Sequence, residues 1–239
     1  MIRLNKGDTF LFIGDSITHG GRGSSMDLNH IMGHGFAEMV SARLAADNLA
    51  AMPRFINKGI SGDTAQRVYA RWTEDALSLS PTHISLLVGV NDLYADLALP
   101  AGLAAEKYLS TIAAILRDTR AVLPEVKFFL CEPFYADVRN QDAPYENIPH
   151  PFCERPFAFS NNPRNPERTQ ETLRRLGDIC EALPNLAENF GAVFVPFRDL
   201  FVPRKDVPLS YLIWDNLHPT VAGHQLLADR WLSVANTVL

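Results

Sequence analysis

The chain has 239 residues, of which 47% are hydrophobic, and a formal net charge of −5 at pH 7. This length and apolar content suit one domain, residues 1–239, with a full hydrophobic core, and require no second domain. Both charge signs are interspersed without a basic stripe, and the longest apolar runs fall far short of a ~20-residue membrane span, so neither nucleic acid nor membrane is an expected partner.

Strand-like apolar runs alternate along the chain with helical patterns. The predicted strands are Thr9–Ile13, Arg54–Asn57, His83–Val88, Val126–Cys131 and Ala192–Val195. The predicted helices are His34–Asp47, Ala65–Ser78, Ala101–Leu123, Thr169–Phe190 and Pro219–Ala235, the last with proline at its first position, as helix starts prefer. Strand–helix alternation of this kind predicts parallel pairing and a three-layer α/β/α sandwich.

The first predicted strand leads into the stretch Gly14-Asp15-Ser16. Gly14 interrupts the apolar run, and Asp15 and Ser16 are residue types of turns and helix N-caps. Ser16 is therefore predicted at the carboxyl end of a strand, where open α/β sheets bind ligands. A serine at such a place usually caps the next helix. It becomes a nucleophile only with a base within hydrogen-bond reach and donors for the oxyanion.

Two later strand ends offer such donors. Gly62 lies in a glycine-containing stretch after the second strand, and without a side chain its backbone N–H can approach a substrate closely. Asn91 follows the strand His83–Val88, and its side-chain amide could donate to an oxyanion. Taken alone, each has a plainer reading, a turn at Gly62 and an Asx-turn at Asn91.

A base and its partner are found before the last helix. His218 precedes Pro219, which favours an extended backbone, and Asp215 lies three residues earlier. One turn can bring the Asp215 carboxylate to the imidazole, where it would fix the tautomer and stabilise the imidazolium. The neighbouring Trp214 could line an acyl pocket or belong to the core.

Together, Gly14-Asp15-Ser16, Gly62, Gly89-x-Asn91-Asp92 and Asp215-x-x-His218-Pro219 resemble the motifs of the SGNH hydrolases, the GDSL esterase/lipase superfamily, in order and approximate spacing from about residue 9 to 233. The resemblance implies Ser16 as nucleophile, His218 as base and Asp215 as the residue that orients it. It implies an oxyanion hole formed by the Ser16 N–H, the Gly62 N–H and the Asn91 side chain. It also implies a flavodoxin-like, five-stranded parallel sheet.

The finer motifs are most similar to the acetylxylan-esterase-type branch, whose members act on carbohydrate esters and often form homo-oligomers. These motifs are Gly14-Asp15-Ser16-Ile17-Thr18, Gly59-Ile60-Ser61-Gly62-Asp63-Thr64 with Arg71-Trp72 after it, Gly89-Val90-Asn91-Asp92 and His218-Pro219-Thr220-x-x-Gly223-His224. We therefore expect a serine esterase that removes a small acyl group, chiefly acetyl, from a sugar or similar polar acceptor. A lysophospholipase or thioesterase is the alternative within the enzyme class, and a non-catalytic carbohydrate-binding domain is the alternative outside it. Asp15 and Trp214 are candidate substrate-binding residues, although Asp15 and Asp92 more readily hold their loops through backbone N–H groups.

A proline- and aromatic-rich insertion at about 134–168 departs from the strand–helix pattern. Its prolines exclude a helix or a central strand, and its aromatic content is too high for a disordered linker. Long ordered loops are usually functional. Because the insertion leaves the carboxyl end of a strand, we predict that it borders the mouth of the active site and limits acceptor size; subunit contact is the alternative.

The remaining sequence features concern the cellular compartment of the protein and its need for a metal or cofactor. Cys131, Cys153 and Cys180 are an odd number without a C-x-x-C pair, which predicts reduced thiols in a cytoplasmic protein. The first nine residues lack the long apolar core of a signal peptide. His30 and His34 have the i, i+4 spacing of some metal ligands, but the glycines around them disfavour a rigid helix. We expect no metal and no other cofactor.

Overall fold

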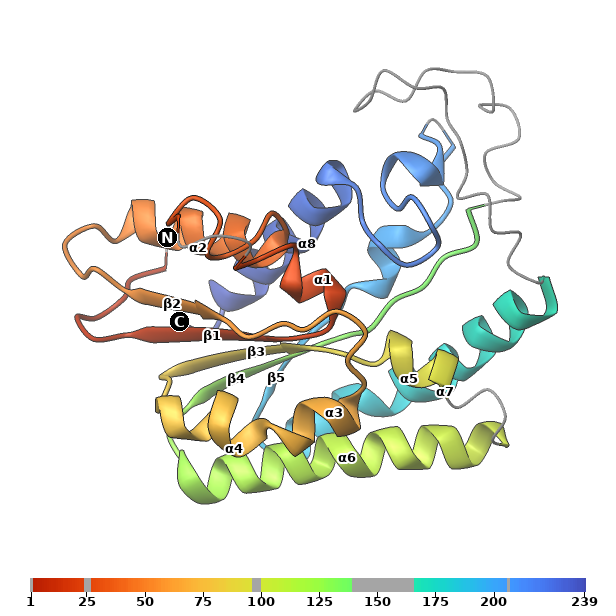
Figure 1. Cartoon of the computed structure of the whole chain (residues 1–239), viewed down its shortest axis with the longest axis horizontal. Coiled ribbons are helices and arrows are strands. Elements are labelled where there is room, and N and C mark those ends of the chain that lie inside the picture. The colour runs from red at the N-terminus through yellow and green to blue at the C-terminus, as the bar shows by residue number, and fades with distance from the viewer. Residues whose placement is uncertain (1, 24–26, 96–99, 139–165, 206) are drawn as a thin grey trace.

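The computed structural model describes residues 2–23, 27–95, 100–138, 166–205 and 207–239. Its centre is a five-stranded sheet in which every neighbouring pair is parallel, in the order β2-β1-β3-β4-β5 (Figure 1). The strands are β1 (Thr9–Gly14), β2 (Arg54–Asn57), β3 (His83–Leu87), β4 (Lys127–Cys131) and β5 (Val193–Val195). The predicted flavodoxin-like sheet is confirmed, and each predicted strand end lies within one residue of the observed one.

Helices cover both faces of this sheet and make the three layers of the predicted sandwich. In Figure 1, α2 and α8 lie on one face, and α3, α4, α6 and α7 lie on the other. The helices are α1 (Ser16–His19), α2 (Phe36–Asp47), α3 (Ala65–Ala70), α4 (Trp72–Asp75), α5 (Val90–Ala95), α6 (Ala101–Val122), α7 (Pro166–Asn189) and α8 (Val221–Ala235). Within the described part of the chain, no helix combines the length and apolar composition needed to cross a bilayer.

A buried tryptophan anchors each helical layer to the sheet. Trp231 of α8 packs against Phe10, Phe12 and Phe129, and its indole N–H donates to Ser85 Oγ at 3.1 Å. On the other face, Trp72 packs against Phe128 of β4 with ring centroids 6.1 Å apart, and its indole N–H donates to the Thr119 hydroxyl of α6 at 3.0 Å. Aromatic pairs of this kind combine a large buried area with a satisfied polar group, and thereby fix the layers relative to the strand ends.

Several details of the helices differ from the sequence predictions. Helix α2 begins at Phe36, two residues after the predicted start, and α7 begins at Pro166, three residues before it. The helix predicted over Ala65–Ser78 breaks at Arg71, which ends α3 and precedes α4. The last helix begins at Val221, not at Pro219, because Thr220 is its N-cap and accepts a hydrogen bond from the Gly223 N–H at 3.3 Å. The short helices α1 and α5 were not predicted, since one or two turns carry no readable periodicity.

Candidate active site

Ser16 is the first residue of α1, immediately after β1 and its N-cap. The N-cap, Asp15, accepts a hydrogen bond from the Ile17 N–H through Oδ1 at 3.0 Å, which secures the turn from strand to helix. The Ser16 hydroxyl lies 2.9 Å from Nε2 of His218, although the two residues are 202 positions apart. The predicted nucleophile and base are thus within hydrogen-bond distance.

Asp215 holds the other side of the His218 ring. Its Oδ2 lies 2.8 Å from His218 Nδ1, and its Oδ1 accepts from the backbone N–H groups of His218 at 2.7 Å and Leu217 at 3.2 Å. Burial acts to raise the pKa of this carboxyl, but the hydrogen bonds from His218 and Leu217 outweigh it and the pKa is lowered. The carboxylate therefore stays ionised and can stabilise a positive imidazolium.

Asn216, between the two, was not singled out from the sequence. It is buried and adopts a left-handed backbone with φ +75°, which asparagine tolerates better than most residues. Its carbonyl accepts from the Ala136 N–H at 2.9 Å, its Oδ1 from the Val138 N–H at 3.2 Å, and its amide donates to the Tyr135 hydroxyl at 3.1 Å. The chain after β4 thus fixes the loop that carries Asp215 and His218.

These contacts also correct part of the interpretation of the 134–168 insertion. We expected its aromatic residues to lie over the active site or against another subunit. Phe134 instead is buried in the chain's own core, stacked on Phe201 with ring centroids 4.3 Å apart. Residues 139–165, including Cys153, lie outside the described residues, so the role predicted for that part as a substrate wall stays a prediction; Cys131 and Cys180 are buried and free.

Gly62 and Ser16 follow β2 and β1, which are neighbours in the sheet. Gly62 has φ +82°, and a Cβ built there would meet nothing within 4 Å, so the space beside it is open. The Ser16 N–H belongs to the first turn of a helix, whose donors have no partner within the helix. Among the described residues, neither the Ser16 N–H nor the Gly62 N–H has a hydrogen-bond acceptor. Both are therefore available to an oxyanion.

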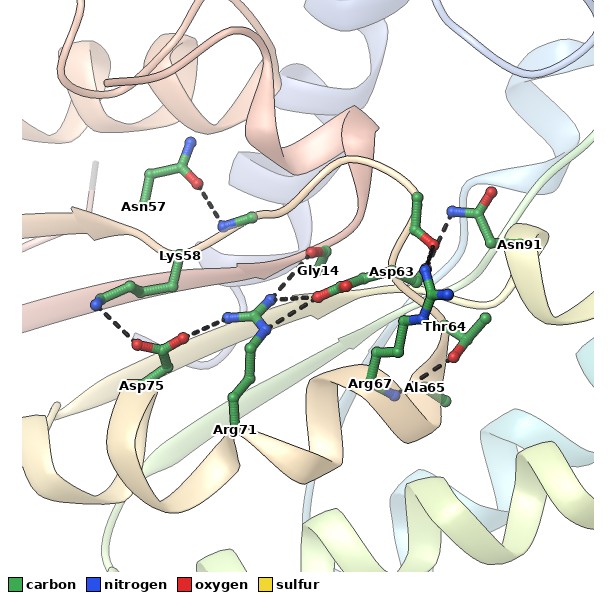
Figure 2. A network of polar contacts seen from close by, with 12 residues as sticks. Gly14, Asn57, Lys58, Asp63, Thr64, Ala65, Arg67, Arg71, Asp75 and Asn91 are labelled. Carbon is green, nitrogen blue, oxygen red and sulfur yellow. Dashed lines mark hydrogen bonds and ion pairs between the residues drawn. The ribbon is translucent and has the colours of Figure 1, made fainter. Parts of the chain in front are cut away.

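Asn91 lies in the first turn of α5, after β3 on the other side of β1. Its Nδ2 donates to the backbone carbonyl of Asp63 at 3.0 Å, which leaves the second N–H of the amide for another acceptor (Figure 2). The predicted loop-holding role of Asp92 is confirmed, because both its oxygens accept from the Ala65 N–H at 3.0 Å. The loop with Gly62 is thus tied to the first turn of α5.

The two candidate substrate-binding residues have different surroundings. Asp15 is only 1% exposed and accepts from the Ile17 N–H, so the prediction that it binds substrate is wrong: its carboxyl closes the turn and faces no solvent. Burial raises the pKa of Asp15 to about 7. Trp214 is 48% exposed and stacks near His218, with ring centroids 6.2 Å apart, so it stays a candidate for contact with substrate.

A buried histidine, His83, and a half-buried one, His224, give the protein a predictable response to acid. His224 accepts from the Phe36 N–H through Nδ1 at 3.2 Å, and burial, aided by His218, lowers its pKa from 6.5 to about 4. Burial likewise lowers the pKa of His83 to about 4. Between pH 4 and pH 6.5, each of these histidines is protonated in the unfolded chain and neutral in the folded one. The free energy of unfolding therefore decreases as the pH falls through this range.

For His224→Asn, which keeps an acceptor near the position of Nδ1, we expect the acid-induced loss of stability to shrink by about 1–2 kcal/mol between pH 7 and pH 4.5. Urea unfolding of wild type and variant at several pH values measures the difference. The comparison must be differential, because the raised pKa of Asp15 acts in the opposite direction over the same range. Parallel pH profiles for the two proteins would contradict the assignment.

His30 and His34, whose spacing resembles that of some metal ligands, are close together in the structure. His30 Nδ1 and His34 Nε2 lie 3.3 Å apart on the exposed surface. Among the side chains that the structure describes, no group of three or more histidines, cysteines, aspartates or glutamates could hold a metal ion.

Comparison with known proteins extends over nearly the whole chain. The model of the GDSL-like lipase/acylhydrolase family matches residues 12–226. An acetylxylan esterase from Geobacillus stearothermophilus is 28% identical over 238 residues, which cover 97% of this chain and 95% of that protein. Among solved structures, a Parabacteroides merdae protein assigned as a GDSL-like lipase has a TM-score of 0.77 at 28% identity, covering 98% of this chain and 97% of that one.

Structures of the Geobacillus esterase, Axe2, are also similar. One has a TM-score of 0.73 at 26% identity and covers 97% of this chain and 95% of that one. Variants of Axe2 described as catalytic mutants replace a serine, an aspartate or a histidine by alanine, and the aspartate and histidine are three positions apart.

Proposed function

Because the chain belongs to the GDSL-like lipase/acylhydrolase family, we propose that it hydrolyses a small acyl ester, most simply an acetyl ester, of a carbohydrate or similar polar acceptor through an acyl-enzyme on Ser16. The resemblance predicted from the sequence motifs is confirmed, and the protein is a carboxylic ester hydrolase. We further propose the identity of the acyl group, the covalent intermediate and the roles of the individual residues.

The observation that carries the proposal is the chain of contacts from Ser16 Oγ to His218 Nε2, at 2.9 Å, and from His218 Nδ1 to Asp215 Oδ2, at 2.8 Å. Ser16 Oγ attacks the ester carbonyl carbon while His218 Nε2 takes the hydroxyl proton. Asp215 keeps the ring in the required tautomer and balances the charge of the imidazolium. His218 then returns the proton to the departing alcohol, and the acyl group remains on Ser16.

Water completes the cycle by the same route. His218 takes a proton from water as its oxygen attacks the acyl carbon, and it gives this proton to Ser16 Oγ when the carboxylic acid departs. In both halves, negative charge develops on the carbonyl oxygen. The Ser16 N–H, the Gly62 N–H and the second N–H of the Asn91 amide are the proposed donors to it.

Two observations support a short acyl group on a sugar. A relative that matches 97% of the chain is an acetylxylan esterase, and its catalytic aspartate and histidine have the spacing of Asp215 and His218. The exposed ring of Trp214 beside His218 offers a flat apolar face on which a sugar can stack.

The acyl preference can be tested with p-nitrophenyl esters from acetate to decanoate. We expect the highest kcat/KM with acetate and a fall of about 10-fold or more by octanoate, because each misfitting methylene is worth on the order of 1 kcal/mol in a closed pocket. Release of acetate from acetylated xylo-oligosaccharides, followed by NMR, then tests the acceptor.

A kcat/KM that rises with chain length would favour the lysophospholipase or thioesterase alternative and contradict the proposed acyl group. Absence of turnover with every ester, in a folded protein that still binds oligosaccharide, would favour the carbohydrate-binding alternative. The Ser16→Ala variant, assayed in parallel, corrects for spontaneous hydrolysis of the reactive esters.

A further inference from the structure

A partly buried ionic network includes Asp63 (Figure 2), which lies next to Gly62 in the loop between β2 and α3. Its centre is Arg71, at the break between α3 and α4. The guanidinium donates to Asp63 Oδ2 from Nε at 3.0 Å and from Nη2 at 2.8 Å, and to Asp75 Oδ2 from Nη1 at 2.7 Å. Asp75 Oδ1 in turn accepts from Lys58 Nζ at 2.8 Å. The side chains of Arg71 and Asp63 are only 16% and 8% exposed.

The network reaches two of the proposed oxyanion donors through Asp63. Asp63 follows Gly62 directly, so a shift of its backbone changes the direction of the Gly62 N–H. The carbonyl of the same residue accepts the hydrogen bond from Asn91 Nδ2 at 3.0 Å, so the shift also reorients the Asn91 amide. The ion pair with Arg71 therefore fixes Asp63, which is bonded covalently to Gly62 and by a hydrogen bond to Asn91.

The loop is also joined to the strand that carries the nucleophile. The Ile60 N–H donates to the Gly14 carbonyl at 3.0 Å, two residues before Ser16. Arg71 Nη2 approaches the same carbonyl at 3.5 Å, the longest of its contacts. The guanidinium therefore faces the junction between the Gly62 loop and the end of β1, as Figure 2 shows.

We propose that Arg71 is a positioning residue for the oxyanion hole, acting through its ion pair with Asp63 to set the Gly62 N–H and the Asn91 amide. This inference rests on the proposed function. An arginine suits the task because its planar, rigid fork can contact two carboxylates and a carbonyl at once, which the single ammonium of lysine does not do with the same geometry. A shift of about 1 Å in such donors can cost on the order of 100-fold in rate.

A role of this kind differs measurably from a contribution to stability alone. The negative charge on the substrate oxygen develops only in the transition state, so misplaced donors lower kcat and leave KM nearly unchanged. Loss of stability lowers the folded fraction, which thermal unfolding and the concentration of folded protein report separately. The kcat per folded molecule therefore separates the two.

The chain contains a matched control in Arg120. Its guanidinium donates to four backbone carbonyls, those of Phe190, Gly191, Pro124 and Val126, at 2.7–3.2 Å. These carbonyls precede β4 and β5, at the edge of the sheet opposite the carboxyl ends where Ser16 lies. Arg120→Gln removes a comparably bonded arginine without touching the Gly62 loop.

The test compares Arg71→Gln, Asp63→Asn, their double variant and Arg120→Gln on p-nitrophenyl acetate. We expect kcat per folded molecule to fall by about 10- to 100-fold for Arg71→Gln and for Asp63→Asn, with KM within about two-fold of wild type. The double variant should lose little more than either single variant, because both remove the same contact. Arg120→Gln should lower Tm and keep kcat within about two-fold.

A wild-type kcat in folded Arg71→Gln, an equal loss in Arg120→Gln, or a rise in KM at constant kcat would overturn the role of Arg71. If Arg71→Gln does not fold, Asp63→Asn decides the question, because asparagine keeps the shape of the side chain and loses only the charge. A wild-type kcat in Asp63→Asn would then overturn it. Ser16→Ala belongs in the same series: activity of that variant would remove the proposed function itself, whereas an inactive Ser16→Ala beside a fully active Arg71→Gln removes only this inference.

Discussion

Replacement of Ser16 by alanine should lower kcat for p-nitrophenyl acetate by about 10⁴-fold or more while the protein stays folded. The hydroxyl lies 2.9 Å from His218 Nε2, and without it no acyl-enzyme can form. Ser16 is half-buried and does not belong to the hydrophobic core formed by the described residues, so Tm should be nearly unchanged. The measurement is steady-state turnover, with far-UV circular dichroism and thermal unfolding on the same preparation.

Ser61 supplies a matched control, because it is an exposed serine one residue before Gly62 whose hydroxyl lies 3.4 Å from His19 Nδ1 and contacts none of the proposed triad. Ser61→Ala should keep kcat within about ten-fold of wild type. A folded Ser16→Ala protein with turnover near that of wild type would show that another group is the nucleophile.

The second large effect is expected at Asn91. Asn91→Ala should lower kcat by about 10²–10³-fold and change KM much less, as expected for an oxyanion donor that acts in the transition state. Part of this loss will come from the released Asp63 carbonyl, to which Asn91 Nδ2 now donates at 3.0 Å. Steady-state kinetics over a full substrate range give kcat and KM separately.

Asn91→Asp provides the sharper comparison, since it keeps the size of the side chain, removes both N–H donors and places a negative charge near the developing oxyanion. It should lose at least as much kcat as Asn91→Ala. If KM rises in either variant while kcat holds, Asn91 binds substrate and is no oxyanion donor.

The centre of the sheet could be predicted because β1, β3 and β4 are buried along almost their whole length. A run such as Phe10 to Ile13 is fully apolar and is bounded by Gly14, so its type and its end are both readable from the sequence. The strand ends in turn placed Ser16, Gly62 and Asn91 on adjacent strands, and the order β2-β1-β3 puts the nucleophile between the two loops. Local pattern and sheet geometry together placed these residues at neighbouring strand ends, whereas the roles proposed for them came from the resemblance to the family.

The residues that hold the site in place could not be found in this way. Arg71 contacts Asp63 eight positions earlier across a break between helices, and periodicity predicts a single unbroken helix there. Asn216 is fixed by the chain after β4, about 80 positions away. Such contacts depend on the tertiary arrangement and leave no mark in the local sequence beyond the residue type, such as an asparagine where the backbone is left-handed.

For Asp15, the sequence suggested a functional role that the structure does not support. A carboxylate next to the proposed nucleophile looks like a group for binding substrate, but the turn from β1 into α1 directs it inward to the Ile17 N–H. Its neighbours Asp63 and Asp92 add to the effect of burial, and its pKa rises to about 7. The sequence shows the residue type, whereas the direction of its side chain follows from the geometry of the turn.

The most direct test of the account is covalent labelling with a fluorophosphonate, which modifies the activated serine of serine hydrolases irreversibly. Intact-mass and peptide mass spectrometry count the attached groups and locate them, while residual esterase activity is measured on the same samples. We predict one group per chain, attached to Ser16, with activity lost in proportion to its incorporation. Loss of activity with the label on another residue, or full activity in protein labelled at Ser16, would contradict the assignment of Ser16, His218 and Asp215 as the catalytic triad.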